Sequence, residues 1–329
     1  MTGHDVESAA AGPAHGPGLL PTATLAIAWL VFAWPWLTGD VTIPWDAKAH
    51  FAPQVEFMAH SFATGQWPFW NPYVFSGQVQ IGDPQSMLFS PPMVLLALTT
   101  SAPSLWAIDT VALAMLFIAG VGVLWLASDR GWHWAAGLIA ALGFAFGAAM
   151  AWRLQHFEQV FALAYYPFAV VLLARALNRN SIVYGALAGV VATIIVLGRN
   201  QVGLLCIYLL VGQVVWHWID GPGRFARIVS SLKPLAAGAV VGIALIALPI
   251  LVMLQHAEIS NRSTIDYAGA AAGSLHPALA VTALIPHLFG AAGPMAEYWG
   301  PPSFTWQGTG IFLAQNMGLL YIGACLLYT

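Results

Sequence analysis

Long apolar runs constrain this chain more than any other feature. A helix needs about 20 consecutive apolar residues to cross a bilayer. Runs close to that length occupy eight segments: 19–39, 103–127, 134–152, 159–177, 182–198, 202–219, 235–255 and 309–328. Only 7% of the residues are charged and 59% are hydrophobic, which is far outside the range of soluble globular proteins. The predicted fold class is therefore all-α, a polytopic transmembrane helical bundle of about eight spans in one domain, residues 19–329.

The two ends of the chain differ in composition and lead to separate predictions. Residues 1–18 contain no Lys or Arg and are rich in Gly, Ala and Pro. This tail lacks the positive region of a cleavable signal peptide, so we expect it to be disordered and the run that follows to remain as a span. The chain ends at Thr329, within or just after its last apolar run. We therefore expect a polytopic protein truncated at its C-terminus.

Charge and cysteine content exclude several classes of protein. The net charge is −3 and no basic cluster is present, so the sequence predicts no nucleic-acid partner. Cys206 and Cys325 both fall in apolar runs, without the paired spacing of a zinc site. Neither a metal-thiolate site nor a disulfide framework is expected, and both cysteines are interpreted as packing residues.

Positive charges in the short connections predict the orientation of the spans. If the N-terminus is cytoplasmic, the inner connections hold Arg130, Arg175, Arg179, Arg224, Arg227 and Lys233, and the outer ones hold Lys48, Arg153, Arg199 and Arg262. The inner connection DGPGRFARIVSSLK has three cations and one acid, which makes it the clearest inside signal. The polar loops 40–92 and 256–308 are then expected on the outer side of a bacterial inner membrane.

The first outer loop, residues 40–92, concentrates polar groups in an otherwise apolar chain. Within it, Phe51, Val55, Met58 and Phe62 recur at helical spacing, which predicts a helix lying in the interface with its apolar stripe toward lipid. On such a helix Asp46 and His50 are i, i+4 neighbours pointing away from the stripe. The next run, 91–100, is too short to cross and is interpreted as an interfacial or re-entrant helix. A second short helix is expected over 274–290, with Pro277 in its first turn.

Asp46 and Asp83 are the candidate catalytic residues of this loop. A carboxylate at the membrane surface, beside a cavity that excludes water, has a raised pKa and can act as a general base. Both residues also suit helix N-caps, Asp83 especially because Pro84 follows it. Two carboxylates on one loop could hold a divalent cation, since hard cations take oxygen ligands. The sequence leaves the metal requirement open and predicts no other cofactor.

Two outer turns and one outer loop supply candidate substrate-binding residues. The turn WRLQHFEQ holds Arg153, His156 and Glu158, the turn LGRNQV holds Arg199, Asn200 and Gln201, and the long outer loop holds Arg262. Guanidinium groups bind phosphate through paired hydrogen bonds, although they also reach toward ordinary lipid headgroups.

Two features inside the predicted spans also need an interpretation. Asp109 is the one acid predicted within a span, where it could cap, pair or line a cavity. Gly143 and Gly147 form a GxxxG pattern, which is typical of helix packing.

The order of several motifs resembles a known family. The first outer loop reads WDAKAHFAPQ, then GQWPFWNPYVFSGQ, then GDPQSMLFSPP; later come HFEQ, GRNQ, SNRSTIDYAGAAAGSLHP, IPHLFG and EYWG. This chain is similar over most of residues 19–329 to the YfhO family of bacterial membrane proteins, within the GT-C superfamily of integral-membrane glycosyltransferases. The first loop is the most specific part of the likeness.

The resemblance implies an enzyme that takes a sugar from a polyprenyl-phosphate donor. The sugar would pass, with inversion, to a cell-envelope glycan, lipid or protein acceptor on the outer face, among membrane lipids. In such enzymes an acid of the first outer loop is the proposed base, and Asp46 matches it by position. His50 and the outer turns would then contact substrate, and Asp83 matches a family position of less defined role.

Two other functions remain open from the residues alone. A transporter or flippase of a lipid-linked substrate would use internal repeats and ionisable groups near the membrane midplane, and this chain shows neither beyond Asp109. A non-catalytic membrane scaffold would use the first outer loop to hold a partner. Both alternatives predict function without Asp46.

Overall fold

The computed structural model describes residues 16–151, 153–197 and 201–260, and the shorter pieces 264, 266–267, 277–285, 288–290 and 299–300. The chain divides into two compact units, Met1–His256 and Ala257–Thr329. In the second unit the described residues include one 3₁₀ helix, η3 (Pro277–Ala283). It covers part of the short helix expected over 274–290.

Five described helices are long and apolar enough to cross a membrane: α1 (Leu19–Leu37), α4 (Leu105–Asp129), α7 (Phe157–Asn178), α9 (Gln201–Ile219) and α10 (Arg224–Glu258). Two shorter apolar helices, α5 (Trp134–Phe146) and α8 (Ile182–Val196), cover parts of two further expected spans. The expected span 309–328 lies outside the described residues. The mostly helical fold class is confirmed, and the five long apolar helices are consistent with a membrane-embedded protein.

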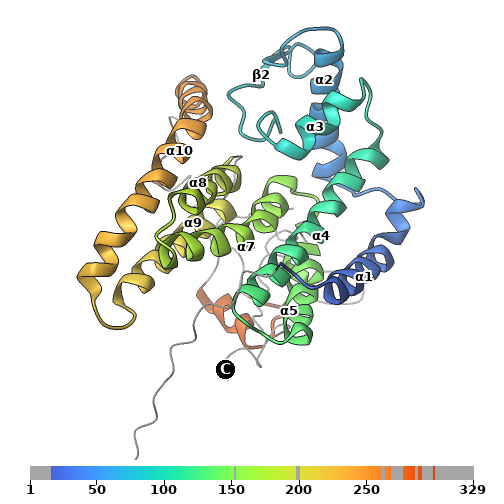
Figure 1. Ribbon diagram of the computed structural model, residues 1–329. Helices are drawn as coiled ribbons and strands as arrows, with labels where there is room; N and C mark the ends of the chain where they lie inside the picture. Colours follow the sequence, from blue (N-terminus) through green and yellow to red (C-terminus); the bar gives the residue numbers. More distant parts are fainter. Residues whose placement is uncertain are drawn as a thin grey trace, which may run out of the picture. The chain divides into compact units, whose positions relative to one another are not determined.

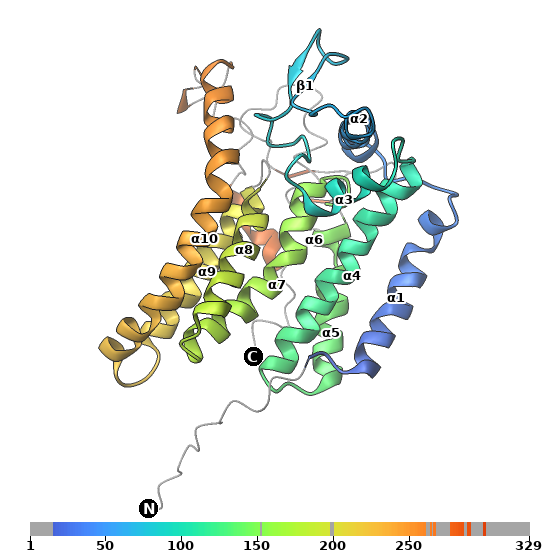
Figure 2. The same ribbon diagram turned by 45° about the horizontal axis from the view of Figure 1, so that its top comes forward.

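The helices of the first unit run side by side, and the chain alternates between their two ends (Figures 1 and 2). One end carries the polar segment between α1 and α4, the short turn before α7 and the end of α10. Two contacts establish this grouping: Asp46 lies against His156, and Gly82 lies against His256. We call this the loop end of the unit.

The polar segment folds into five short elements. They are a π-helical turn η1 (Ala47–Phe51), helix α2 (Ala52–Ala63), strands β1 (Trp70–Asn71) and β2 (Gln78–Val79), and helix α3 (Pro91–Thr99). The strands form an antiparallel hairpin that pairs Trp70 with Val79. Pro91 and Pro92 open α3, where a missing N–H costs nothing because the first turn has no acceptor for it.

The helix expected after Asp46 is present, but its apolar stripe does not face lipid. Phe51, Val55 and Met58 are fully buried in a core that also contains residues of α3, α4 and α7, and Phe62 packs on that core. The prediction of a lipid-facing stripe was wrong, because protein helices cover it. The stripe therefore fixes the loop to the bundle.

The span expected over 134–152 is interrupted at Gly147. Helix α5 ends at Phe146, Gly147 takes extended ψ, and a separate turn of helix, α6 (Ala148–Ala151), follows. A Cβ at Gly147 would collide with the carbonyl oxygen of Gly143. The GxxxG pair thus serves a change of chain direction rather than the helix packing that we expected, and the break leads into the turn that carries His156.

Candidate functional site

The site begins where the chain leaves α1. Asp109 of α4 is buried, and its Oδ2 accepts hydrogen bonds from the Thr42 hydroxyl at 2.6 Å and from the Ile43 N–H at 2.9 Å. Of the three roles open for Asp109, the structure assigns pairing. These bonds hold the start of the polar segment against α4.

Trp45 and Asp46 then turn the chain into η1. Trp45 has φ of +65°, a left-handed conformation that costs a non-glycine residue free energy. Asp46 occupies the N-cap position of η1, but its side chain makes no capping hydrogen bond. The N-cap interpretation of Asp46 was therefore wrong, and its carboxylate, with the side chain 54% exposed, is turned to another partner.

That partner is His156, from the turn before α7. His156 Nδ1 lies 3.3 Å from Asp46 Oδ2. The fully buried rings of Phe51 and Phe157 stack with centroids 5.1 Å apart, which locks η1 against the start of α7. The stack therefore brings two distant parts of the sequence together.

His50 lies in the same turn but makes a different contact. The Gln54 side-chain amide approaches the His50 ring nitrogen Nε2 at 3.0 Å. Asp46 and His50 were expected to be i, i+4 neighbours on one helix. In the structure the Asp46 carboxylate instead lies beside His156.

The surroundings of His156 lower the pKa of its imidazole from the ordinary value of 6.5. Burial is the largest cause, and the nearby Arg153 charge adds to it, whereas the Asp46 carboxylate acts in the opposite direction. A lowered pKa leaves the ring neutral at pH 7. The contact is then one between a carboxylate and a neutral imidazole.

Two other candidates lie in the turn before α7 and in the first turn of α7 itself. Arg153 Nη1 donates a hydrogen bond to Gln159 Oε1 at 2.7 Å, and the His156 N–H donates to the Arg153 carbonyl at 2.7 Å. Glu158 is only 5% exposed and lines a cavity. The structure therefore places Arg153 and His156 in the turn, with Asp46 against His156, whereas Glu158 lies in the first turn of α7.

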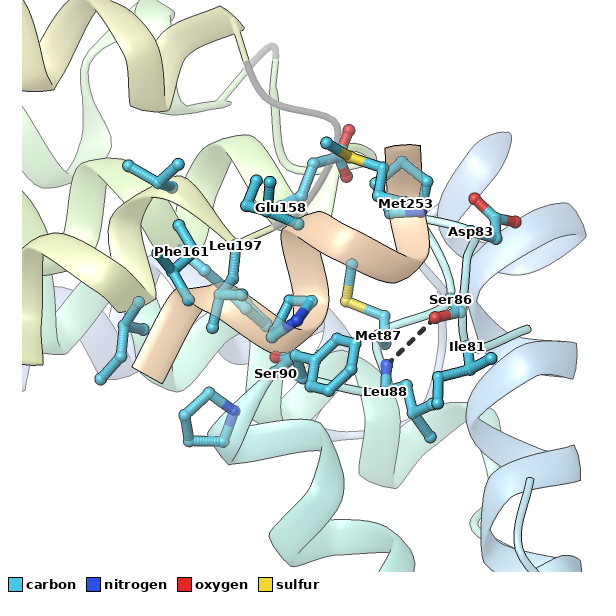
Figure 3. Close-up of a pocket in the computed structure, with 18 of the residues that line it drawn as sticks. Ile81, Asp83, Ser86, Met87, Leu88, Ser90, Glu158, Phe161, Leu197 and Met253 are labelled. Atoms are coloured by element: carbon cyan, nitrogen blue, oxygen red, sulfur yellow. Dashed lines mark hydrogen bonds between the residues drawn. The ribbon is translucent and has the colours of Figure 1, made fainter. Parts of the chain in front are cut away.

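The cavity beside Glu158 has a volume of about 180 Å³ and mostly apolar walls. Its walls come from residues 81–91, α7, α8, α9 and α10, and they include Met87, Phe161, Leu197 and Met253 (Figure 3). Asp83 lines this cavity and Asp46 does not. The two candidate acids of the first loop thus occupy different surroundings.

Asp83 lies in a turn. Its Oδ1 accepts from the Gln85 N–H at 2.9 Å, and its Oδ2 accepts from the Gln78 side-chain amide at 3.0 Å. No helix begins at Pro84, so the prediction that Asp83 caps the start of a helix was wrong. The carboxylate caps a turn instead and ties it to strand β2.

The remaining candidates are less defined. Gln201 is the exposed first residue of α9, and Arg199, Asn200 and Arg262 lie outside the described residues. Among the residues that the structure describes, no three His, Cys, Asp or Glu side chains form a group that could hold a metal ion. The divalent cation stays an untested prediction.

Sequence reasoning missed that Glu158 lines an apolar cavity. The only local signal was its position one residue after the buried Phe157, at the start of a long apolar helix. The cavity also depends on helix packing that no local pattern specifies. Comparison with protein-family models, curated proteins and solved structures finds no match to this chain.

Proposed function

We propose that this chain is a membrane glycosyltransferase of the GT-C type, similar to the YfhO family. It moves a sugar from a polyprenyl-phosphate donor to an envelope glycan, lipid or protein on the outer face of a bacterial inner membrane. Its bundle has eight spans and a cytoplasmic N-terminus. The observation that supports this proposal most is the Asp46–His156 contact, which joins the first outer loop to the turn that leads into the apolar cavity.

Asp46 acts as the general base in this proposal. It takes the proton of an acceptor hydroxyl while that oxygen attacks the anomeric carbon. The bond from this carbon to the phosphate oxygen breaks, and the polyprenyl phosphate leaves with the electron pair. Attack opposite the leaving group inverts the anomeric centre, and the proton passes from Asp46 to solvent. Neutral His156 orients the carboxylate through the 3.3 Å contact.

The two ends of the donor need different surroundings. Its isoprenoid chain suits the apolar cavity, whose two lining carboxylates, Asp83 and Glu158, repel phosphate. The phosphate suits Arg153 at the neighbouring turn. The sequence offers Arg199, with Asn200 and Gln201, or Arg262 as alternative phosphate ligands. Guanidinium groups stabilise the charge that develops on the leaving phosphate.

Replacing the base tests the proposal. Asp46→Asn keeps the shape of the side chain but removes its basicity, so we expect transfer from a polyprenyl-phosphate sugar to fall by about 10²- to 10⁴-fold. Asp40→Asn is the matched control, because Asp40 lies in the same segment and accepts a hydrogen bond from the nearby Thr38 hydroxyl at 2.7 Å. Its activity should stay at the wild-type level. Wild-type transfer by folded Asp46→Asn would overturn the base assignment.

The cavity itself also suits a second function, translocation of a lipid-linked substrate. The cavity has apolar walls from α7, α8, α9 and α10 and one buried carboxylate, that of Glu158. Such a cavity could hold a lipid-linked substrate without catalysing a reaction on it. Reconstituted vesicles distinguish the two functions. Movement of a labelled lipid-linked sugar that persists in Asp46→Asn, with no release of polyprenyl phosphate by the wild type, would favour translocation.

A further inference from the structure

A second concavity lies on the polar segment and shares no lining residue with the cavity beside Glu158. It has a volume of about 400 Å³ and is more open, within the range of about 300–1,000 Å³ for small-molecule sites. Its lining residues include Glu56, Phe57, His60, Asn71, Tyr73 and Ser101. We call it the hairpin groove, since α2 forms one wall and the β1–β2 hairpin forms another.

Helix α2 presents a defined face to the hairpin groove. Pro53, Glu56, Phe57 and His60 all line it, and their spacing of three and four residues places them on one side of a helix. The opposite side, with Val55 and Met58, is buried in the core. Packing of that side fixes the rotation of α2, so the groove face is held in place before any ligand arrives.

The hairpin wall is also fixed. Gly77 has φ of +119°, and a Cβ there would collide with the Trp70 ring, so only glycine lets this indole fold against the turn. Buried Asn71 accepts the Tyr73 N–H on its Oδ1 at 3.0 Å. The Tyr73 ring meets Phe57 edge to face, with centroids 6.2 Å apart, and Tyr73 remains 79% exposed.

We propose that the hairpin groove binds a neutral or amino-bearing sugar unit of a glycan. Exposed aromatic rings such as Tyr73 pack against the apolar C–H face of a pyranose, and the Glu56 carboxylate and His60 imidazole match its hydroxyls. The lining includes the carboxylate of Glu56 and contains no Lys or Arg. Anionic sugars and phosphate are therefore disfavoured at this surface.

A lipid surface is the competing occupant, because exposed aromatic residues also anchor proteins at membranes. The hairpin groove suits lipid poorly, since immersion would remove water from the exposed Glu56 and His60 side chains at a cost. The glycan-binding proposal does not depend on catalysis by Asp46. Binding to the groove and transfer by the chain can be measured separately, so either can fail alone.

Direct binding to the full chain in lipid nanodiscs tests the proposal. The probes are cellotetraose and chitotetraose, with tetragalacturonic acid as the anionic comparison, measured by saturation-transfer NMR and titration calorimetry. We expect a neutral tetraose to bind, the anionic one to bind more weakly, and Tyr73→Ala or Glu56→Gln to weaken binding about tenfold, as expected for loss of one aromatic or charged hydrogen-bonding contact.

Phe75→Ala is the matched control, because Phe75 is 90% exposed on the same hairpin and does not line the groove. Its affinity should equal that of the wild type, and melting temperatures verify that each variant is folded. Absence of binding to both neutral tetraoses, or equal binding by Tyr73→Ala and the wild type, overturns the proposal. Quenching of a fluorophore on Tyr73→Cys by spin-labelled lipid would overturn it in favour of a membrane-anchoring surface.

Discussion

The electrostatics of His156 depend on two neighbouring residues with opposite effects. Burial and Arg153 lower the pKa of its imidazole, and the Asp46 carboxylate raises it. The net shift is downward, so burial outweighs the attraction of the carboxylate. Asp46 and Arg153 can each be replaced while His156 is kept, so the effect of each on the pKa of His156 can be measured separately.

We predict that His156 titrates below its ordinary pKa of 6.5. Asp46→Asn should lower its midpoint further because the favourable carboxylate is gone, and Arg153→Gln should raise it because an unfavourable charge is gone. NMR titration of imidazole-labelled protein in detergent measures all three midpoints. The opposite order of the two variants would contradict the Asp46–His156 contact.

Asp109 is a positioning residue for the loop that leads to Asp46. Asp109→Ala removes the acceptor of the Thr42 hydroxyl and the buried Ile43 N–H. Each orphaned donor costs about 1–3 kcal/mol, so we expect a lower melting temperature and faster proteolysis between α1 and η1.

Thr110→Ala provides the comparison for this change, since the Thr110 hydroxyl donates to a carbonyl of its own helix, that of Trp106, at 2.7 Å. It should leave both readouts close to wild type. Equal protease sensitivity of Asp109→Ala and the wild type would show that the loop is held by other contacts.

Residue types were predictable from the sequence, but their partners were not. Asp46 was predicted as a site residue because a carboxylate at the membrane surface can act as a general base and because its position matches the proposed base of the family that the chain resembles. Its partner His156 was predicted only as a separate substrate-binding residue, since the Phe51–Phe157 stack that joins the two segments is a tertiary contact. Local spacing instead favoured His50, which contacts Gln54.

At the scale of helices, small residues bring α8 and α10 into close contact. A Cβ at Gly185 would collide with the Pro234 carbonyl oxygen, and one at Gly189 with the Gly238 carbonyl oxygen. The Thr193 hydroxyl donates to the Gly242 carbonyl at 3.3 Å. Such backbone-to-backbone packing is typical of helices in lipid, and both helices continue into the cavity wall.

We predict that Gly189→Val separates α8 from α10 and destabilises the protein by about 1–3 kcal/mol, as overpacking does. A lower melting temperature measures this effect, and weaker binding of an isoprenoid phosphate should accompany it because Ile194 and Ile246 line the cavity. Gly212→Val in α9 is the control, since a Cβ there meets nothing within 4 Å. Similar losses in both variants would contradict specific packing.

The apolar runs of the sequence predicted which segments form helices, but they did not predict where those helices end. The break at Gly147 and the early end of α8 depend on which backbone groups find partners in the folded bundle. The stripe of α2 likewise has the same pattern whether it meets lipid or protein. Its burial against α3 and α4 could be decided only by the tertiary fold.

For the whole molecule, polar chemistry gathers at the loop end of the first unit. The opposite end has a buried ion pair between Arg175 Nε and Asp129 Oδ1 at 2.8 Å, with Arg175 stacked over Trp125. This pair ties α4 to α7 at the end away from the candidate site. The sequence predicted this asymmetry through its charge distribution, but it could not specify the cavity, which needs walls from four helices and a loop.

The alternation of the helices gives a topology prediction. In a chain whose Cys206 and Cys325 are changed to Ser, a cysteine at Thr64 should react with a membrane-impermeant maleimide added outside intact cells. A cysteine at Pro222 should react only after the cells are opened. Both positions are exposed, so equal labelling of the two in intact cells would contradict the alternation or the proposed orientation.

The composition of the cavity wall has a consequence for biogenesis. Asp83 and Met253 line one cavity, yet about two thirds of the first unit, Met1–His256, must be synthesised between them. While the ribosome is still making α9, the wall formed by α10 does not exist and Glu158 lacks one side of its enclosure. The nascent chain therefore cannot close the cavity until α10 has been made and packed, which makes the cavity one of the last parts of the first unit to form.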